Sequence, residues 1–338
     1  MAVGYRRERI DRGIKARCDD IFALSSYREV LYLVVPRVLP VLLLLVIPLV
    51  VGIYWAKVIV MACIIAILAL SWDLMFAAGM ISLGQALFFG IGAYIAGSLN
   101  HYLGLPPAFT IPIATIGGGI LCTLLLSPVL RLRGIYFAMV TLALSLMFVR
   151  IIEATRILGG TEGMTALSPF PSLWVEVYLS LIVVLLCLFG FRRLINTDYG
   201  LVLRGIGEND RAVMSGGINI YWYKAQTLFI GSAVAAFAGA FTAHYQMVVG
   251  MAAFALDYSI LPLAAVVVGG SGTFAGAALG ALILVPLSEA LRAFVGLRIV
   301  FYCLAMVIFI VALPEGIFHY LQRRYHQFER LVEVEVRK

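Results

Sequence analysis

The chain has 338 residues, of which 63% are hydrophobic and only 13% are charged. Soluble domains carry roughly 25% charged residues, so this composition excludes a soluble globular protein. A net charge of +7 would suit a nucleic-acid partner in a soluble protein. In a membrane protein it reports orientation across the bilayer, so we expect no nucleic-acid partner.

Apolar runs of about 20 residues, the length of a membrane-crossing helix, recur along the chain. We therefore predict an all-α, polytopic membrane protein with about ten transmembrane helices and an internal repeat, embedded in membrane lipid. The predicted spans are 38–55, 58–78, 81–99, 108–128, 135–155, 173–191, 225–248, 258–274, 276–294 and 298–313. Residues 1–37 and 316–338 are predicted as cytoplasmic segments that flank a transmembrane region, 38–315.

Basic residues gather in a few connections between these spans. Residues 1–37, the loop after the fourth span, the loop 192–224 and the C-terminal tail together hold 20 of the 25 Lys and Arg residues. The positive-inside rule places such segments in the cytoplasm. We predict a multi-pass protein of the inner (cytoplasmic) membrane with both termini cytoplasmic, and we expect Ser168, in the loop 156–172, to be labelled from outside.

The charged start of the chain lacks the pattern of a cleavable signal peptide. Residues 8–24 predict an amphipathic helix, because they place five apolar residues near one helical face: Ile10, Ile14, Cys18, Ile21 and Phe22. It lies either on the membrane surface or against the protein's own cytoplasmic side. The five cysteines are far apart, and no Cys or His cluster predicts a metal site.

Two segments combine many glycines with polar side chains inside apolar spans. The first is "GMISLGQALFFGIGAYIAG" at 79–97, and the second is "VVGGSGTFAGAALGALIL" at 267–284. Small residues let helices approach closely, and they also permit broken helices that line a cavity. The glycines therefore either pack helices together or line a cavity, and both interpretations stay open. The predicted helix-packing or hinge residues are Gly79, Gly84, Gly269, Gly270, Gly272 and Gly276. The predicted pathway residues are Ser82, Gln85, Tyr94, Thr141 and Ser271.

The longest polar loop, 192–224, predicts a short capped helix. Glu208, Asn209 and Asp210 supply N-cap chemistry for a helix over 211–215, which the glycines at 216 and 217 would end. A rigid, capped helix at the membrane surface suits docking to a partner protein. The alternative is an ordinary connecting loop.

This loop carries a specific resemblance. "GLVLRGIGENDRAVMSGGIN" is similar to the cytoplasmic coupling loop of branched-chain amino acid ABC transporter permeases, and the matching positions are Gly200, Arg204, Glu208, Asn209, Gly217, Ile218 and Asn219, with Asp210 in place of a second Glu. The stretches 71–97, 130–144, 159–165 and 267–281 resemble further family segments in the family's order and indicate its M-type membrane subunit. Ala77 stands where the family often has glycine, and the family's His/Gln position is Gln85.

The resemblance implies an importer. A second permease, expected to be a paralogous H-type subunit, would complete the path, and an extracytoplasmic binding protein would deliver a branched-chain amino acid. Two ABC ATPase subunits would bind ATP and Mg²⁺, because this chain has no phosphate-binding G-x-x-x-x-G-K-[ST] motif. We therefore expect no cofactor in this chain and no enzymatic activity. Relatives of similar sequence move urea or short amides, which remain alternative substrates.

A stand-alone secondary transporter is the rival from another class, because ionisable residues inside membranes often mark ion pathways. The candidates are Asp73, Glu153 and Glu289, and we interpret all three as structural. Glu153 is three residues from Arg150 and Glu289 three from Arg292, which is the spacing of helical ion pairs. The four histidines are dispersed, so no constellation predicts a membrane enzyme.

Overall fold

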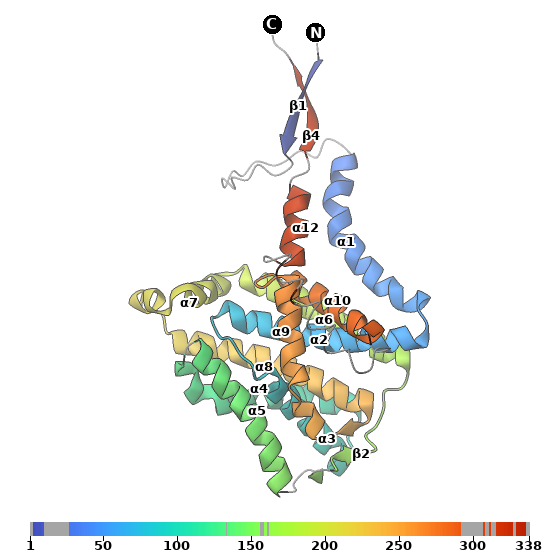
Figure 1. The fold of residues 1–338 in the computed structure, drawn as a ribbon, viewed down its shortest axis with the longest axis vertical. Coiled ribbons are helices and arrows are strands. Elements are labelled where there is room, and N and C mark those ends of the chain that lie inside the picture. Colours follow the sequence, from blue (N-terminus) through green and yellow to red (C-terminus); the bar gives the residue numbers. More distant parts are fainter. Residues whose placement is uncertain are drawn as a thin grey trace.

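The computed structural model describes residues 3–9, 27–132, 134–155, 159–160, 162–291, 307, 311, 316–326 and 329–335. Within these residues the protein is predominantly helical, which confirms the predicted class (Figure 1). Two short two-stranded sheets were not predicted. Strand β1 (Val3–Arg9) pairs antiparallel with β4 (Glu329–Glu335), and β2 (Met164–Thr165) pairs antiparallel with β3 (Val248–Val249).

The first nine predicted spans each correspond to one described helix, in the predicted order, whereas α7 lies in the predicted loop 192–224 and α12 in the predicted C-terminal segment. The bounds of the helices are α1 Tyr27–Val50, α2 Ile53–Ala77, α3 Gln85–Leu103, α4 Pro107–Leu126, α5 Ile135–Thr155, α6 Leu173–Ile195, α7 Asp198–Ser215, α8 Ile220–Gln246, α9 Asp257–Gly269, α10 Phe274–Ala290 and α12 Ile317–His326. Two short 3-10 helices, η1 (Ser127–Arg131) and η3 (Met251–Phe254), extend α4 and precede α9.

Six of the described helices are long and apolar enough to cross a membrane: α2, α4 with η1, α5, α6, α8 and η3 with α9. The count of ten therefore stays a prediction. The predicted bounds of the first span were wrong. Helix α1 begins at Tyr27 rather than at residue 38, and the break between α1 and α2 falls at residues 51–52 rather than at 56–58. The span 298–313 and the internal repeat are not established, since most of that span lies outside the described residues.

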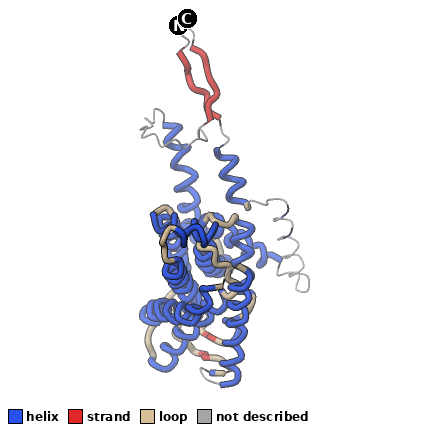
Figure 2. The backbone as a smooth tube through the Cα atoms, turned by 90° about the vertical axis from the view of Figure 1, so that its left-hand side faces the viewer, coloured by secondary structure: helices blue, strands red, loops and turns tan. Residues whose placement is uncertain are grey.

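The N-terminal amphipathic helix is also untested. Residues 8 and 9 belong to strand β1, and residues 10–24 lie outside the described residues. The two terminal strands pair with each other, so the ends of the chain lie side by side, away from the main body of helices (Figure 2). This arrangement agrees with termini on one side of the membrane, and which side remains a prediction.

Helix α2 is the centre of the core. It is apolar on every side, and residues 62–75 are all buried, as expected for a helix that is hydrophobic all round. Helices α6, α8, α9 and α10 pack around it (Figure 1). Helix α8 also packs tightly on α3 and α4, where glycines replace larger side chains: a Cβ on Gly92 or Gly239 would overlap the backbone of the facing helix.

Two faces of the body lie opposite each other, one at α7 and one at β2 (Figure 1). The first, which we call the α7 face, carries α7, the break after α2 and the turn between α9 and α10. The opposite face carries the turn between α3 and α4 and the β2–β3 pair. Asn100 at the end of α3 donates from Nδ2 to the Ser168 hydroxyl at 3.0 Å, and His244 near the end of α8 bonds the Ser168 carbonyl at 2.9 Å. These bonds fasten the loop before α6 to the helix ends on the opposite face.

Labelling can test the orientation of these two faces. Because the backbone and hydroxyl of Ser168 are hydrogen-bonded, the exposed Thr165 is a better probe of the same loop. In a variant with Cys18 and Cys303 replaced by serine, Thr165→Cys should react with a membrane-impermeant maleimide from outside intact cells. Met214→Cys on α7, whose residue is 55% exposed, should react only after permeabilisation. Reaction of both from the same side would contradict the ten-span topology.

Candidate functional site

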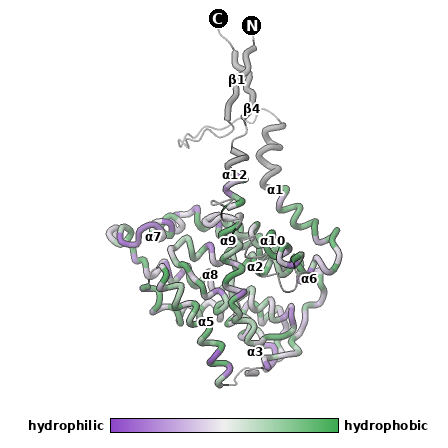
Figure 3. The backbone as a smooth tube through the Cα atoms, in the orientation of Figure 1, coloured by the Kyte–Doolittle hydropathy of each residue, from purple (hydrophilic) through white to green (hydrophobic). Residues whose placement is uncertain are grey.

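Helix α7 is much more polar than the helices of the core, and it lies at the edge of the body (Figures 1 and 3). Its buried residues are Gly200, Leu203 and Ile206, which recur every three residues and face the body. Arg204 and Glu208 are exposed. The predicted loop 192–224 is thus mostly helical, since α6 continues to Ile195 and α8 begins at Ile220.

A kink at Asn209 divides α7 in two. Its backbone is non-helical (φ −154°, ψ 97°), and its Oδ1 accepts hydrogen bonds from the backbone N–H of Arg211 at 3.1 Å and of Ala212 at 3.3 Å. Asn209 is therefore the N-cap of the second half, as the predicted capped helix requires. Of the three predicted capping residues, Asn209 supplies the cap, whereas Glu208 precedes it and Asp210 follows it.

The end of α7 also follows the sequence pattern. Gly216 is the C-cap, and Gly217 has φ +77°, a left-handed conformation that glycine adopts without steric cost. Ile218 is partly buried, and the Asn219 side chain caps α8 by accepting from the N–H of Trp222 at 3.3 Å. At the other end, a Cβ on Gly200 would overlap the backbone of Ile195, so glycine permits the tight turn from α6.

A buried ion pair ties the second half of α7 to α8. Lys224 Nζ lies 3.0 Å from Asp210 Oδ2, and the two side chains are only 6% and 10% exposed. The sequence pattern missed this pair, because Lys224 was counted as one more basic loop residue. A pairing at a spacing of 14 residues, across a turn, leaves no periodic signal in the sequence.

Helix α7 rests directly on the end of α2. A Cβ on Gly207 would meet the Ala77 carbonyl oxygen at 2.8 Å, and a Cβ on Gly79 would meet the Gly207 Cα at 3.2 Å. Gly79 has φ +70°, so it also turns the chain out of α2. Two glycines thus bring the backbones of α7 and the α2 turn into contact with no side chain between them.

Beyond this turn the chain is non-helical until α3 begins at Gln85. Polar groups from other helices satisfy its backbone: Trp72 Nε1 donates to the Ser82 carbonyl at 2.6 Å, and Thr141 Oγ1 accepts from the N–H of Leu83 at 3.2 Å. Ser259 Oγ accepts from the N–H of Ala86 at 3.0 Å. This is the arrangement that a helix break inside a membrane protein needs, because no water there can satisfy freed backbone groups.

Ser82, Gln85, Tyr94 and Thr141 are all buried, as predicted for pathway candidates. Ser82 and Gln85 do not share a helical face, since Ser82 precedes the helix. Gln85 Oε1 accepts from the Ser71 hydroxyl at 3.2 Å, whereas Gln85 Nε2 and the Tyr94 hydroxyl have no hydrogen-bond partner within the described residues. A buried donor without a partner costs about 1–3 kcal/mol, so these two atoms stand out as groups that a ligand or water would satisfy.

The second glycine segment forms the turn between α9 and α10. In this segment, Gly269 and Gly276 are packing positions, because a Cβ on either would overlap the backbone of a neighbouring segment. Gly84 of the first glycine segment is a packing position for the same reason. Gly270 and Gly272 have positive φ and form the turn itself. Ser271 is exposed in this turn, so the structure does not bring it together with Ser82, Gln85 and Thr141.

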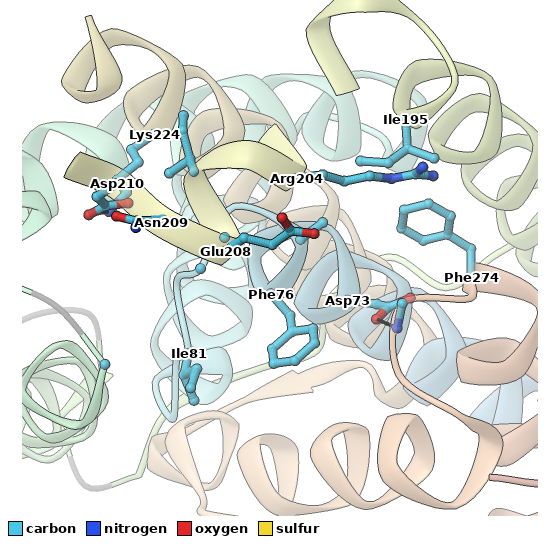
Figure 4. A pocket seen from close by; sticks show the side chains of 16 residues that line it. Asp73, Phe76, Ile81, Ile195, Arg204, Glu208, Asn209, Asp210, Lys224 and Phe274 are labelled. Carbon is cyan, nitrogen blue, oxygen red and sulfur yellow. Dashed lines mark hydrogen bonds and ion pairs between the residues drawn. The ribbon is translucent and has the colours of Figure 1, made fainter. Parts of the chain in front are cut away.

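A cavity of about 580 Å³ lies between α7, the end of α2 and the α9–α10 turn (Figure 4). Asp73 of α2 lies in its wall, with Oδ1 accepting from the N–H of Gly272 at 2.8 Å. Arg204 and Glu208 of α7 also line it. A smaller cavity of about 160 Å³, lined by Phe89, Thr242 and Tyr258 among others, lies nearer the opposite face.

The other ionisable candidates are paired. Arg150 Nη1 donates to Glu153 Oε2 at 2.8 Å, which confirms the predicted pair, and Glu289 Oε1 accepts from the Tyr54 hydroxyl at 2.6 Å. Arg292 lies outside the described residues. No cluster of three or more potential metal ligands occurs within the part of the chain that the structure describes.

Removing the Asn209 cap gives a direct test of the second half of α7. Asn209→Ala should destabilise this segment by about 0.5–2 kcal/mol, because the N–H groups of Arg211 and Ala212 lose their acceptor. Asn209→Ser retains a capping oxygen and is expected to behave like the natural protein. Amide hydrogen exchange over 210–215 measures the difference, and equal protection in both variants would show that the cap does not stabilise this segment.

The buried helical core, the helix break and the surface helix α7 define a multi-pass helical membrane protein. The family described as branched-chain amino acid transport system / permease component matches residues 54–313, and the chain belongs to this family. It is similar to the high-affinity branched-chain amino acid transport system permease protein LivM of Escherichia coli (strain K12), with 31% identity over 271 residues, 71% of this chain and 64% of that protein.

A second relative is the probable branched-chain amino acid transport permease protein LivM of Methanocaldococcus jannaschii, with 30% identity over 218 residues, 58% of this chain and 63% of the relative. The chain thus spans less than two thirds of the length of each of these relatives. No solved structure matches it. The relatives are named as permease proteins, which confirms the prediction of a transport component rather than an enzyme.

Proposed function

We propose that the chain is a membrane-spanning subunit of an ABC importer for branched-chain or related amino acids. The observation that carries this proposal is the capped helix α7, packed closely against the end of α2 on one face of the body. Its sequence resembles the family's coupling loop, and the relatives are named for branched-chain amino acid transport.

The proposed assembly contains a second, paralogous H-type permease, two ABC ATPase subunits and an extracytoplasmic binding protein. The ATPase subunits bind ATP and Mg²⁺, consistent with the absence of a phosphate-binding loop from this sequence. The α7 face is cytoplasmic in this proposal, and the second half of α7, from Asn209 to Gly217, docks in a groove of an ATPase subunit.

The contacts of α7 suggest how movement reaches the membrane interior. Closure of the ATPases displaces α7, and the displacement passes through Gly207 to the turn at Gly79. The segment that follows carries Ser82 and the start of α3, so its position relative to Thr141 changes with α7. Because close-packed glycines leave no compressible side chain between the backbones, the two segments move together.

We also place the translocation pathway beside this segment, at the start of α3. Gln85 is the first residue of α3, where the positive end of the helix dipole favours an anionic group. Its unpaired Nε2 is a buried donor in the same position. We propose that these donors contact the substrate carboxylate as it passes, with Ser82 and Thr141 nearby and with Tyr94 and Ser271 as further pathway candidates.

Reconstitution of the complete assembly in vesicles tests this function. Uptake of leucine, isoleucine or valine should require the binding protein, the ATPase subunits and hydrolysable ATP. Urea and short amides should compete weakly; strong competition by them would assign the chain to an alternative substrate of the same family. Uptake by the permease chain alone, driven by an ion gradient, would instead support a secondary transporter.

Replacing the Gln85 amide separates a pathway role from a packing role. Gln85→Leu is nearly equal in volume and removes both the unpaired Nε2 and the Oε1 that accepts from the Ser71 hydroxyl. These two changes have opposite effects on stability, so thermal stability should change little. If the amide contacts substrate, uptake by the complex should fall by about tenfold, corresponding to one lost hydrogen bond of about 1.4 kcal/mol. Ser145→Ala is the control, because the Ser145 hydroxyl bonds its own helix at Leu142. Wild-type uptake by Gln85→Leu would place Gln85 among the packing residues.

A further inference from the structure

The cavity beneath α7 contains charges that the fold leaves unpaired. Asp73 is fully buried, and its Oδ2 has no hydrogen-bond partner within the described residues. Arg204 and Glu208 line the same cavity (Figure 4) and form no ion pair with any described residue. Asp210 and Lys224, which also line it, are already paired with each other.

The Asp73 carboxylate indicates which charge a ligand of this cavity carries. An ionised carboxylate removed from water is costly unless it is paired and hydrogen-bonded. The fold supplies one bond, from the N–H of Gly272 to Oδ1, and leaves the second oxygen without a donor. A site with this half-satisfied carboxylate favours a ligand that brings a positively charged donor.

The remaining lining defines the rest of the ligand. A guanidinium on α7, Arg204, can hold a carboxylate through two parallel hydrogen bonds. Apolar side chains, including Phe76, Ile81 and Phe274, form walls between the charged groups (Figure 4). The volume of about 580 Å³ falls within the range of about 300–1,000 Å³ found for small-molecule pockets.

We propose that this cavity binds a free zwitterionic amino acid with an apolar side chain. The ligand's ammonium pairs with Asp73, its carboxylate pairs with Arg204, and its side chain contacts Phe76 and Phe274. This inference rests on the proposed function for its substrate class, and it adds a second amino-acid site, on the α7 face, distinct from the pathway around Gln85.

Such a site has a consequence for the transport cycle. Asp73 belongs to α2 and Arg204 to α7, so one bound amino acid bridges the core to the helix proposed to contact the ATPase. Asp73 is covered in the present conformation, so the ligand's ammonium reaches Oδ2 only when the lining side chains shift. Amino acid accumulated on the α7 face therefore holds α7 in place and slows further uptake.

Binding to the full-length chain in lipid nanodiscs, without binding protein or ATPase, tests the site. Saturable binding of radiolabelled L-leucine is expected. Leucinamide, which lacks the carboxylate, and 4-methylpentanoate, which lacks the ammonium, should each compete at least tenfold more weakly. Absence of saturable leucine binding, or equal competition by all three compounds, would overturn the proposal.

Two variants assign the charged ends of the ligand. Asp73→Asn keeps an Oδ1 acceptor for Gly272 but loses the charge, and it should bind leucine at least tenfold more weakly while 4-methylpentanoate is little affected. Arg204→Gln should weaken leucine and 4-methylpentanoate but not leucinamide. Glu153→Gln, whose carboxylate is paired with Arg150 on α5, is the matched control and should bind leucine normally. Unchanged leucine binding by both cavity variants would place the ligand elsewhere.

The complete transporter distinguishes this inference from the proposed function. Vesicles preloaded with leucine on the ATPase side should show slower ATP-driven uptake, and Asp73→Asn should reduce this inhibition. Normal uptake without such inhibition would reject the cavity site and leave the importer function intact. Loss of leucine binding when the ATPase subunits are added would show that an ATPase side chain fills the cavity, which also overturns the proposal.

Discussion

A complex that carries Gly207→Ala is expected to lose most of its substrate-stimulated ATPase activity and its uptake, by roughly tenfold or more. The new Cβ would lie 2.8 Å from the Ala77 carbonyl oxygen, a backbone atom that cannot rotate away. Helix α7 must shift off the end of α2, at a cost of about 1–3 kcal/mol for overpacking. The measurement is coupled ATPase activity of the reconstituted complex, with co-purification of the ATPase subunit recorded in parallel.

Gly205→Ala is the matched control on the same helix. Its Cβ would meet the end of the Val213 side chain at 3.2 Å, and this flexible group can move. Both substitutions raise helix propensity by about 0.5–1 kcal/mol, so a propensity effect would appear in both variants. Loss of coupling in Gly207→Ala alone supports the contact between α7 and α2, whereas equal activity in the two variants would show that α7 is only a connector.

A large effect on stability is expected at Gly239 of α8. A Cβ there would overlap the Phe89 carbonyl oxygen of α3, in the interior of the extensive contact between α3 and α8. Gly239→Ala should therefore separate α3 from α8, lower the thermal unfolding temperature markedly and reduce the yield of folded protein in detergent. Small residues at such interfaces allow the backbone approach from which membrane helices gain their packing energy.

Gly190→Ala on α6 is the control, because it makes the same substitution in a helix where no neighbouring segment is close. No atom of a neighbouring helix or loop within the described residues lies within 4 Å of the added Cβ, so this variant should match or exceed the natural protein in thermal stability. The comparison uses thermal unfolding of both variants in the same detergent, followed by the fraction that remains monodisperse. Equal unfolding temperatures would mean that α3 and α8 can separate without loss, contrary to the packing described above.

Sequence periodicity and composition were sufficient for the helical class and for most helix positions. The runs around 58–78, 108–128, 135–155 and 173–191 each became one helix, because a segment that must satisfy all its backbone groups in lipid has few alternatives to a helix. The cap at Asn209 and the turn at Gly217 were also predictable, since they depend on residues within one turn of each other. The family resemblance followed from the same local motifs.

Contacts between distant residues were decided by the tertiary structure alone. Along the sequence, Gly79 and Asp73 lie in one stretch, far from both Gly207 and Gly272. Only packing brought Gly79 against α7 and Asp73 against Gly272, 199 residues away. The pairing of Lys224 with Asp210, the exposure of Ser271 and the cavity beneath α7 have the same origin. Local patterns record what a backbone can adopt with its neighbours, whereas these features depend on which faces meet once all the helices share one core.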